Sequence, residues 1–339
     1  LQTLETAWQK VAANKGSAGV DGQSIERFGR KASVYLEELS ESLEWGTYTP
    51  HPVKRVEIPK GGGKTRPLGI PVVKDRIVQT ALKMVIEPIF EQMFEESSYG
   101  FRPQRGCKDA LGEVDRLIKE GLTHVVDADL ASYFDTIPHE RLMALVETRI
   151  SDGRILDLIR GYLKQDVISE PKRWTPIGGT PQGAVISPLL ANLYLHPLDR
   201  LMCMKGYRMV RYADDFVVMC PCPESAQSAL AEIRNWVLEN GLTLHPDKSH
   251  VGDCAVPGQG FEFLGYRFEA GKRWVRKKSM KALRDRIRER SKRTCGKSLH
   301  QVIESLNPML IGWFGYFKHA NPSVFKAVDG FTRRRLRAI

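Results

Sequence analysis

Two short apolar runs that end in aspartates constrain the fold of this 339-residue chain more than any other sequence feature. Residues 208–220 read RMVRYADDFVVMC, and residues 123–134 read THVVDADLASYF. Apolar runs of this length predict buried β-strands, and the helical spacings between them predict an α/β arrangement. If the two strands lie side by side, Asp129, Asp214 and Asp215 come close together.

Three carboxylates at one edge of a sheet need a counter-charge, because they repel one another and one would take up a proton. Mg²⁺ prefers sparse carboxylate ligands combined with phosphate oxygens of a substrate. Two such ions about 4 Å apart stabilise both oxygens of an in-line phosphoryl displacement. Asp127 should share a strand face with Asp129 but lie further back, which makes it a reserve candidate, and Asp135 is also nearby. The alternative is a turn whose aspartates only cap local amides.

The glycine run in IPKGGGKTRPLGIP (58–71) has the appearance of a phosphate-binding P-loop. A P-loop requires G-x-x-x-x-G-K-[ST] between a strand and a helix. Here the residue five positions before Gly63 is Ile58, and Pro67 follows almost at once. An NTPase is therefore excluded, and residues 51–71 instead predict a β-hairpin with a flexible basic tip.

A formal net charge of +11 and a pI near 9.3 favour a polyanionic partner, of which nucleic acid is the commonest. Residues 272–293 hold twelve Lys or Arg, which favours a track for a phosphate backbone over a merely solvated helix face. A membrane surface is the rival, but the chain has no run of about eighteen apolar residues and no N-terminal apolar signal segment. We expect no membrane partner and a cytoplasmic protein, with its six scattered cysteines reduced.

Several sequence blocks stand in a fixed order along nearly the whole chain. Three blocks resemble segments of reverse transcriptases. The first catalytic block of that family is similar to DADLASYFDTIPH, the next block to GGTPQGAVISPLLANLYLHPLD and the Y-x-D-D signature to RYADDFVV. RPLGIPVVKDRIVQTAL and SSYGFRP resemble fingers segments of the bacterial group II intron type, and NPMLIGWFGYF resembles the maturase or thumb region. The resemblance implies an α/β right hand, with an antiparallel palm sheet and a thumb of three helices. The expected regions are an N-terminal extension with fingers, the palm and the helical thumb, at 1–122, 123–270 and 271–339.

The resemblance also implies a set of site residues and two Mg²⁺ ions as cofactors, with Mn²⁺ as a substitute ion. Catalysis is assigned to Asp129, Asp214 and Asp215, and metal binding to these three and Leu130. The residues implied for nucleotide binding are Lys60, Arg66, Phe134, Gln182 and Lys248. Those implied for primer or template binding are Arg102, Tyr212, Leu264 and Gly265.

The resemblance also implies individual roles for these residues. Lys60 and Arg66 flank the hairpin turn and would hold the β- and γ-phosphates of an incoming nucleotide. The ring of Phe134 would exclude a ribose 2′-hydroxyl, although a core phenylalanine is the alternative. Gln182 would lie against the nucleotide, and Lys248 would donate a proton to pyrophosphate unless it is only a surface lysine.

The function implied is an RNA-directed DNA polymerase related to group II introns. Its partners would be an RNA template, a DNA primer, dNTPs and a structured intron RNA. The alternative is an RNA-binding maturase or splicing cofactor in which polymerisation is secondary. Ala184 departs from the family pattern, which often has a second glycine after TPQG.

Overall fold

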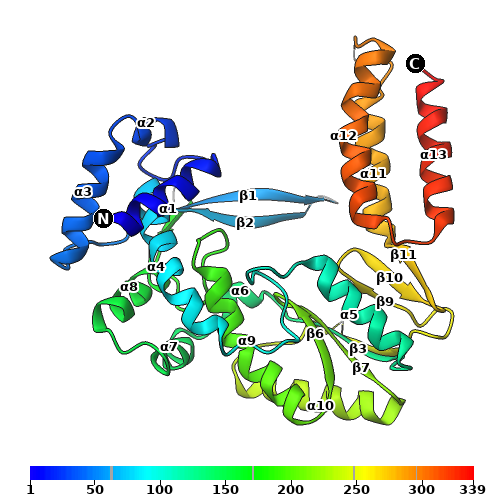
Figure 1. The fold of residues 1–339 in the computed structure, drawn as a ribbon, viewed down its shortest axis with the longest axis horizontal. Coiled ribbons are helices and arrows are strands. Elements are labelled where there is room, and N and C mark those ends of the chain that lie inside the picture. Colours follow the sequence, from blue (N-terminus) through cyan, green and yellow to red (C-terminus); the bar gives the residue numbers. More distant parts are fainter. Residues whose placement is uncertain (62–63, 170–171, 247–248, 295) are drawn as a thin grey trace.

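The computed structural model describes residues 1–339 apart from 62–63, 170–171, 247–248 and 295. Figure 1 shows a helical lobe at one end, a sheet with its helices in the middle and three upright helices at the other end. A long hairpin reaches from the helical lobe toward the upright helices. The mixed α/β architecture expected from the sequence is confirmed, whereas the region boundaries at 122/123 and 270/271 stay predictions.

The N-terminal helices pack on one long helix because each carries an apolar face. Leu4, Ala7 and Val11 recur at helical spacing and are buried, and the ring of Trp8 lies 4.7 Å from that of Phe28. The helices of this lobe are α1 (Gln2–Ala13), α2 (Ile25–Gly29), α3 (Ala32–Glu44) and α4 (Val73–Glu91).

Helix α4 was expected to bend or end near Pro88, and it ends three residues after the proline, at Glu91. A proline inside a helix removes one backbone hydrogen bond and costs about 3 kcal/mol. Ile86 and Phe90, on either side of the proline, are both buried. Their burial offsets that cost and keeps the chain helical.

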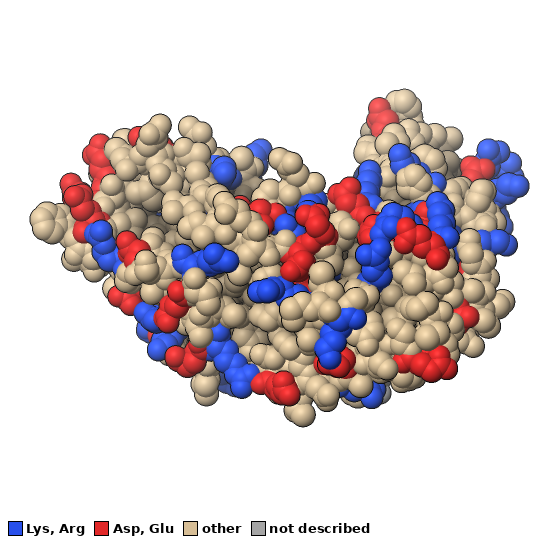
Figure 2. Space-filling view, turned by 60° about the horizontal axis from the view of Figure 1, so that its bottom comes forward, with Lys and Arg blue, Asp and Glu red and all other residues tan. Residues whose placement is uncertain are grey.

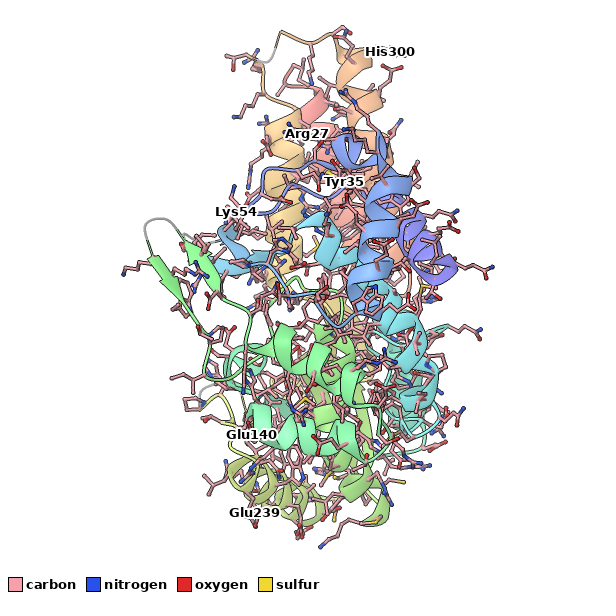
Figure 3. All side chains as sticks on the ribbon, turned by 90° about the vertical axis from the view of Figure 1, so that its left-hand side faces the viewer. Arg27, Tyr35, Lys54, Glu140, Glu239 and His300 are labelled. Atoms are coloured by element: carbon pink, nitrogen blue, oxygen red, sulfur yellow. The ribbon has the colours of Figure 1, made fainter. Side chains whose placement is uncertain are left out.

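The predicted fingers hairpin is confirmed as β1 (Val53–Gly61) and β2 (Lys64–Ile70), which pair antiparallel. Two short strands that the sequence did not suggest, β4 (Val167–Ser169) and β5 (Lys172–Trp174), extend the sheet in the order β2-β1-β4-β5. Figure 3 shows this second hairpin projecting beside Lys54 on β1.

The palm sheet is antiparallel throughout, as expected, with strand order β6-β7-β3-β8. Alternate residues of β3 and β7 enter two different cores, one with α9 and α10 and the other with α5 and Phe261. Burial on both faces explains why these strands read as continuous apolar runs. The strands are β3 (His124–Asp129), β6 (Arg208–Tyr212), β7 (Asp215–Cys220) and β8 (His250–Asp253). The helices are α5 (Cys107–Lys119), α6 (Tyr133–Thr136), α7 (His139–Glu147), α8 (Gly153–Leu163), α9 (Ser187–Met204) and α10 (Pro223–Glu239).

A small three-stranded sheet joins the palm to the upright helices. Its strands are β9 (Phe261–Phe263), β10 (Tyr266–Glu269) and β11 (Lys272–Val275), and the expected turn at Gly271 lies between the last two. The helices that follow are α11 (Lys277–Arg290), α12 (Leu299–Phe317) and α13 (Pro322–Leu336).

The three upright helices share a core of their own, formed by Leu283, Ile287, Val302, Leu306 and Val328. The Asn321 side chain caps α13 by accepting a hydrogen bond from the Ser323 N–H at 3.1 Å. The expected interruption of α12 at Pro308 is wrong, because the helix runs through it between the buried anchors Leu306 and Phe317.

Charge is spread unevenly over the surface. Figure 2 places many Lys and Arg side chains over the right-hand end of the molecule, where α11–α13 stand. Of the helices in the described ranges, none is long and apolar enough to cross a membrane.

Candidate active site

The two aspartate-ending strands lie side by side in the palm sheet. β3 and β7 pair antiparallel, with Asp129 directly opposite Asp215. Asp214 follows Ala213 in the turn between β6 and β7, and Ala213 has a left-handed φ of 60°. Opposed residues of an antiparallel pair have β-carbons about 5 Å apart. The predicted juxtaposition of these two strand ends is therefore confirmed.

The carboxylates of this cluster disfavour one another's charge. Burial raises the pKa of Asp215 to about 7, and the charges of Asp127, Asp214 and Asp129 act in the same direction. Burial also raises the pKa of Asp127 to about 7, although its carboxylate accepts a hydrogen bond from the Glu262 N–H. A site of this kind is stabilised by bound cations, because they restore the balance of charge.

The main chain at Leu130 can supply a further oxygen. Leu130 forms an isolated β-bridge with Leu244, whose hydrogen bonds use the Asp129 carbonyl and the Ala131 N–H. Neither bond consumes the Leu130 carbonyl, the one ligand atom that a leucine can offer. Within the described ranges no three His, Cys, Asp or Glu side chains are already arranged around a metal position.

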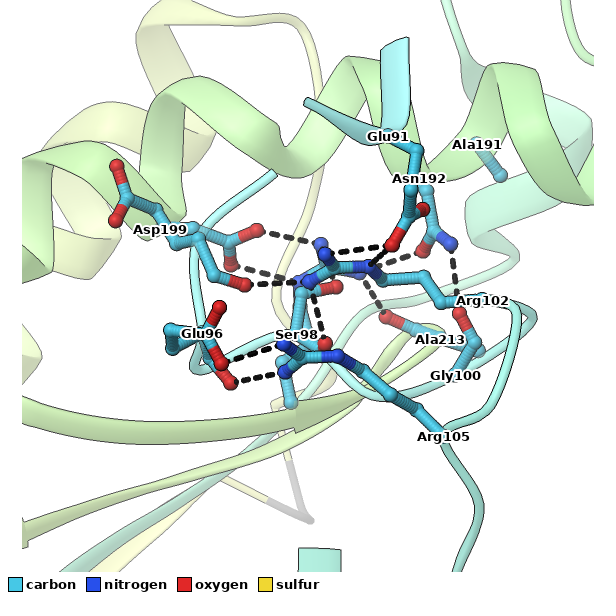
Figure 4. Close-up of polar contacts among 12 residues, drawn as sticks. Glu91, Glu96, Ser98, Gly100, Arg102, Arg105, Ala191, Asn192, Asp199 and Ala213 are labelled. Carbon is cyan, nitrogen blue, oxygen red and sulfur yellow. Dashed lines mark hydrogen bonds and ion pairs between the residues drawn. The ribbon is translucent and has the colours of Figure 1, made fainter. Parts of the chain in front are cut away.

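Arg211, for which the sequence suggested no role, supports the turn that carries Asp214 from inside the protein. Its guanidinium is fully buried and donates to Asp199 at 2.7 and 2.5 Å. It also donates to the Ala213 carbonyl at 2.9 Å, directly before Asp214, and to Asn192 at 2.9 Å (Figure 4). The one signal in the sequence was an arginine inside an apolar strand, because such a residue must find a counter-charge.

Arg102 was expected to contact primer or template, but its side chain is directed into the same buried region (Figure 4). It donates to Glu91 at 2.9 Å and to the carbonyls of Glu95 and Ser98 at 2.6 and 2.9 Å. These intramolecular partners use its donors to hold the segment before α5. We therefore do not propose a direct contact of Arg102 with nucleic acid.

Phe134 and Gln182, both implied for nucleotide binding, line one cavity of about 710 Å³. The cavity lies between the fingers strands and residues 175–182, and Asp135, Arg55 and Trp174 also line it. The three catalytic candidates are absent from its lining. Phe134 and Gln182 thus line a cavity that the three carboxylate candidates do not share.

Arg66 lies on the other face of the fingers hairpin. It is exposed and shares its face with Leu68, because side chains alternate along a strand. A β-carbon placed on Gly183 would come within 2.8 Å of Leu68, so this face meets the Gln182–Gly183 turn. Pro67 and Gly69, on the opposite face, line the 710 Å³ cavity.

The remaining basic candidates are only partly described. Lys60 lies in β1, and the position of its side chain falls outside the described part of the structure. Lys248 falls among the residues that are not described, so its expected role near the triphosphate stays a prediction.

The turn that carries Gln182 is clamped between the fingers and α4. The Gly69 N–H donates to the Gln182 carbonyl at 2.6 Å, and the Gln79 side-chain oxygen accepts from the Val185 N–H at 2.8 Å. Gly183 has a φ of 105°, and a β-carbon there would lie 2.3 Å from the Gly69 carbonyl oxygen. A glycine is thus required for this close approach of two backbones.

The residues expected at the primer lie on the thumb side of the catalytic turn. Leu264 and Gly265 form the turn between β9 and β10, with φ values of 47° and 86°. Tyr212, the last residue of β6, pairs with Asp215 and packs in the same apolar cluster as Leu264. Tyr212 and Leu264 therefore share one apolar cluster, whereas the guanidinium of Arg102 is used by partners inside the protein.

Comparison with known proteins agrees with this geometry. Residues 58–268 match the family model of the reverse transcriptase (RNA-dependent DNA polymerase). The chain belongs to the reverse transcriptase family. Residues 280–339 match the maturase-specific domain of group II introns, so this reverse transcriptase is of the group II intron-related reverse transcriptase/maturase type.

Relatives of this reverse transcriptase include intron-encoded proteins. Protein YkfC of Escherichia coli (strain K12) is 36% identical over 308 residues, covering 78% of this chain and 79% of YkfC. The group II intron-encoded protein LtrA of Lactococcus lactis subsp. cremoris is 38% identical over 199 residues, or 58% of this chain. That match spans 33% of LtrA, about a third of its length.

A solved structure of telomerase from Candida albicans has the same fold. It superposes with a TM-score of 0.54 at 13% identity, over 92% of this chain and 63% of that chain. The right-hand fold expected from the sequence is thus confirmed. Enzymes of the reverse transcriptase family generally use Mg²⁺. The donor set here fits that ion, since it consists of carboxylates and one backbone carbonyl.

Proposed function

We propose that this reverse transcriptase extends a DNA primer along an RNA template with dNTPs. The observation that carries the proposal is the pairing of Asp129 with Asp215 beside Asp214, on a turn that the buried Arg211 supports. Carboxylates concentrated at one sheet edge serve phosphoryl transfer well, because that reaction is catalysed mainly by positioning and charge stabilisation.

Asp129, Asp214, Asp215 and the Leu130 carbonyl would hold two Mg²⁺ ions, with Mn²⁺ as a substitute. When bound, the ions stabilise charge on the attacking and leaving oxygens. The protein's own residues align the reactants: the Leu264–Gly265 turn and Tyr212 hold the primer end, and Arg66 and Lys60 hold the triphosphate. Gln182 lies against the nucleotide, Phe134 excludes ribonucleotides, and Lys248 supplies a proton to pyrophosphate.

Primer extension tests this proposal. The wild-type protein with an RNA template, DNA primer, dNTPs and Mg²⁺ should yield cDNA, and Asp214→Ala should lower the rate by at least about a thousandfold. Asp253→Ala is the matched control, because Asp253 ends β8 opposite His124, at the far end of β3 from Asp129. Robust extension by Asp214→Ala would falsify the metal assignment.

A second function, assistance of intron splicing, is favoured by the maturase-specific match at 280–339. α11 supports it further, because seven of its cationic side chains are exposed and would contact an RNA backbone: Lys277, Lys278, Lys281, Arg284, Arg286, Arg288 and Arg290. Binding to a structured intron RNA should persist in Asp214→Ala, since helices α11–α13 are remote in sequence from the carboxylates. Loss of RNA binding in that variant would contradict a separate maturase function.

A further inference from the structure

The turn expected to hold the primer end is supported by the upright helices α11 and α12 and not by the palm alone. The Tyr316 hydroxyl, from the last turn of α12, donates to the Leu264 carbonyl at 2.7 Å. Leu264 has a left-handed φ of 47°, a conformation that costs a non-glycine residue free energy and persists only where its surroundings fix it. The bond from Tyr316 is one such constraint.

A second hydrogen bond runs in the opposite direction. The Tyr266 hydroxyl, which follows the turn, donates to the Tyr316 carbonyl at 2.7 Å. The last four carbonyls of a helix have no partner within the helix, so this acceptor is available at the end of α12. The two tyrosine rings lie 6.0 Å apart. Two hydrogen bonds, one donated from each side, thus join the β9–β10 turn and strand β10 to helix α12.

Gly265 brings the helix still closer to the turn. A β-carbon at this position would lie 3.4 Å from the Phe317 ring, and the φ of 86° disfavours any other residue. The Gly265 carbonyl accepts a hydrogen bond from the Arg276 N–H at 3.0 Å, at the start of α11. Both sides of the turn therefore face the upright helices: Phe317 belongs to α12, and Arg276 lies at the start of α11.

The same tyrosine packs in the apolar cluster that adjoins the turn carrying Asp214. Tyr212, Leu264 and Tyr316 all pack against this cluster. Tyr212 precedes Asp214 by two residues and pairs with Asp215 across the sheet. One hydrogen bond and a shared apolar cluster therefore connect Tyr316 with the Leu264–Gly265 turn and with Tyr212.

We propose that Tyr316 is a positioning residue that sets the distance between the primer terminus and the carboxylate cluster. It acts through its hydrogen bond to the Leu264–Gly265 turn and through the apolar cluster that it shares with Tyr212. The polymerase-type match ends at residue 268 and the maturase-specific match begins at 280, so this contact joins the two matched segments. The inference rests on the proposed polymerase function, because the role of the turn is to hold a primer.

Tyr316→Phe tests the inference, since it deletes one hydroxyl and keeps the ring packing on Tyr266. We expect the single-turnover extension rate at saturating dNTP to fall about three- to tenfold, the effect of losing one hydrogen bond. The KM for primer–template should rise, and the KM for dNTP should stay within about twofold. Tyr207→Phe is the matched control, a half-buried tyrosine at the α9–β6 junction, and should change none of these. An unchanged rate in Tyr316→Phe, or an equal rise in both KM values, would overturn the proposal.

Gly265→Ala supplies a second variant that strains the same turn from its other side. If both variants act through the turn, the fold-loss of rate in the double variant should be smaller than the product of the two single fold-losses. Independent, multiplicative losses would contradict a shared mechanism.

Hydrogen exchange separates a failure of this inference from a failure of the proposed function. A wild-type protein that extends no primer contradicts the polymerase proposal. In that case, faster exchange of the 263–266 amides in Tyr316→Phe, with weaker primer–template binding, still supports positioning by Tyr316. Unchanged exchange and unchanged binding overturn it.

Discussion

Arg211 and Asp199 form a fully buried ion pair beneath the turn that carries Asp214. The two guanidinium nitrogens lie 2.7 and 2.5 Å from the two carboxylate oxygens, and both side chains have no exposed surface. A third nitrogen of the guanidinium donates to the Ala213 carbonyl. The pair therefore fixes the backbone of the catalytic turn, with Asp199 supplying the counter-charge that keeps the arginine inside.

Asp199→Ala should destabilise the protein by about 3–5 kcal/mol, because it leaves an unpaired charge in the interior. Urea unfolding measures this directly. Glu232→Ala is the matched control: it breaks the surface pair with Lys205, whose atoms are 2.9 Å apart, and should cost less than about 1 kcal/mol. Equal effects of the two variants would mean that the buried pair contributes no more than a surface contact.

Strand pairing in the palm could be predicted from sequence because β3 and β7 are apolar on both faces, and because β3 ends and β7 begins with an aspartate. The antiparallel register that sets Asp129 opposite Asp215 follows once both strands are placed in one buried sheet. The fingers hairpin was equally accessible, since turn residues at the glycine run separate two extended segments. Such features depend on local periodicity, which a single sequence carries.

Features that depend on tertiary partners were not predictable in the same way. Arginine is a residue type that commonly binds phosphate, and only the fold reveals that Glu91 and two backbone carbonyls accept the hydrogen bonds of Arg102. Pro308 signals a helix break locally, but packing of the flanking apolar residues overrides it. The Tyr316–Leu264 bond joins residues 52 positions apart, and no sequence pattern marks it.

Magnesium binding should weaken as the pH falls through about 7. The pKa values of Asp127 and Asp215 are raised from 3.8 to about 7, so protons compete with the ion below that pH. At pH 6 the affinity should be about tenfold lower per protonated carboxyl than at its plateau. Thermal unfolding with and without Mg²⁺, at pH 6 and pH 8, measures the difference.

The metal-free protein should show the opposite trend. A carboxyl that holds its proton more tightly when folded contributes stability below its unfolded pKa, and this is lost as the pH rises from about 4 to about 7. Asp215→Asn removes one of these titrations, so its unfolding midpoint in EDTA should depend less on pH. A steeper dependence in that variant would contradict the raised pKa of Asp215.

Phe134→Ala should relax the choice between dNTPs and rNTPs. If the ring blocks a ribose 2′-hydroxyl, its removal should raise the ratio of rNTP to dNTP incorporation at least tenfold, while dNTP use changes less. Phe134→Tyr is the control, because it keeps a ring of the same shape at this position. Unchanged discrimination in Phe134→Ala would place the selection elsewhere and leave Phe134 as a wall of the 710 Å³ cavity.

Arg66 and Arg55 provide a matched pair on opposite faces of the fingers hairpin. Arg66 shares its face with Leu68, which meets the Gln182–Gly183 turn. Arg55 is on the opposite face, where it lines the 710 Å³ cavity and lies 5.6 Å from the Trp174 ring centroid. Arg66→Ala should raise the KM for dNTP about tenfold or more, since a bidentate contact to phosphate is lost, and Arg66→Lys should restore it only in part. Arg55→Ala should leave that KM within about twofold. Steady-state extension at varied dNTP decides between them: a larger effect at Arg55 than at Arg66 would show that the triphosphate lies on the cavity side of the hairpin.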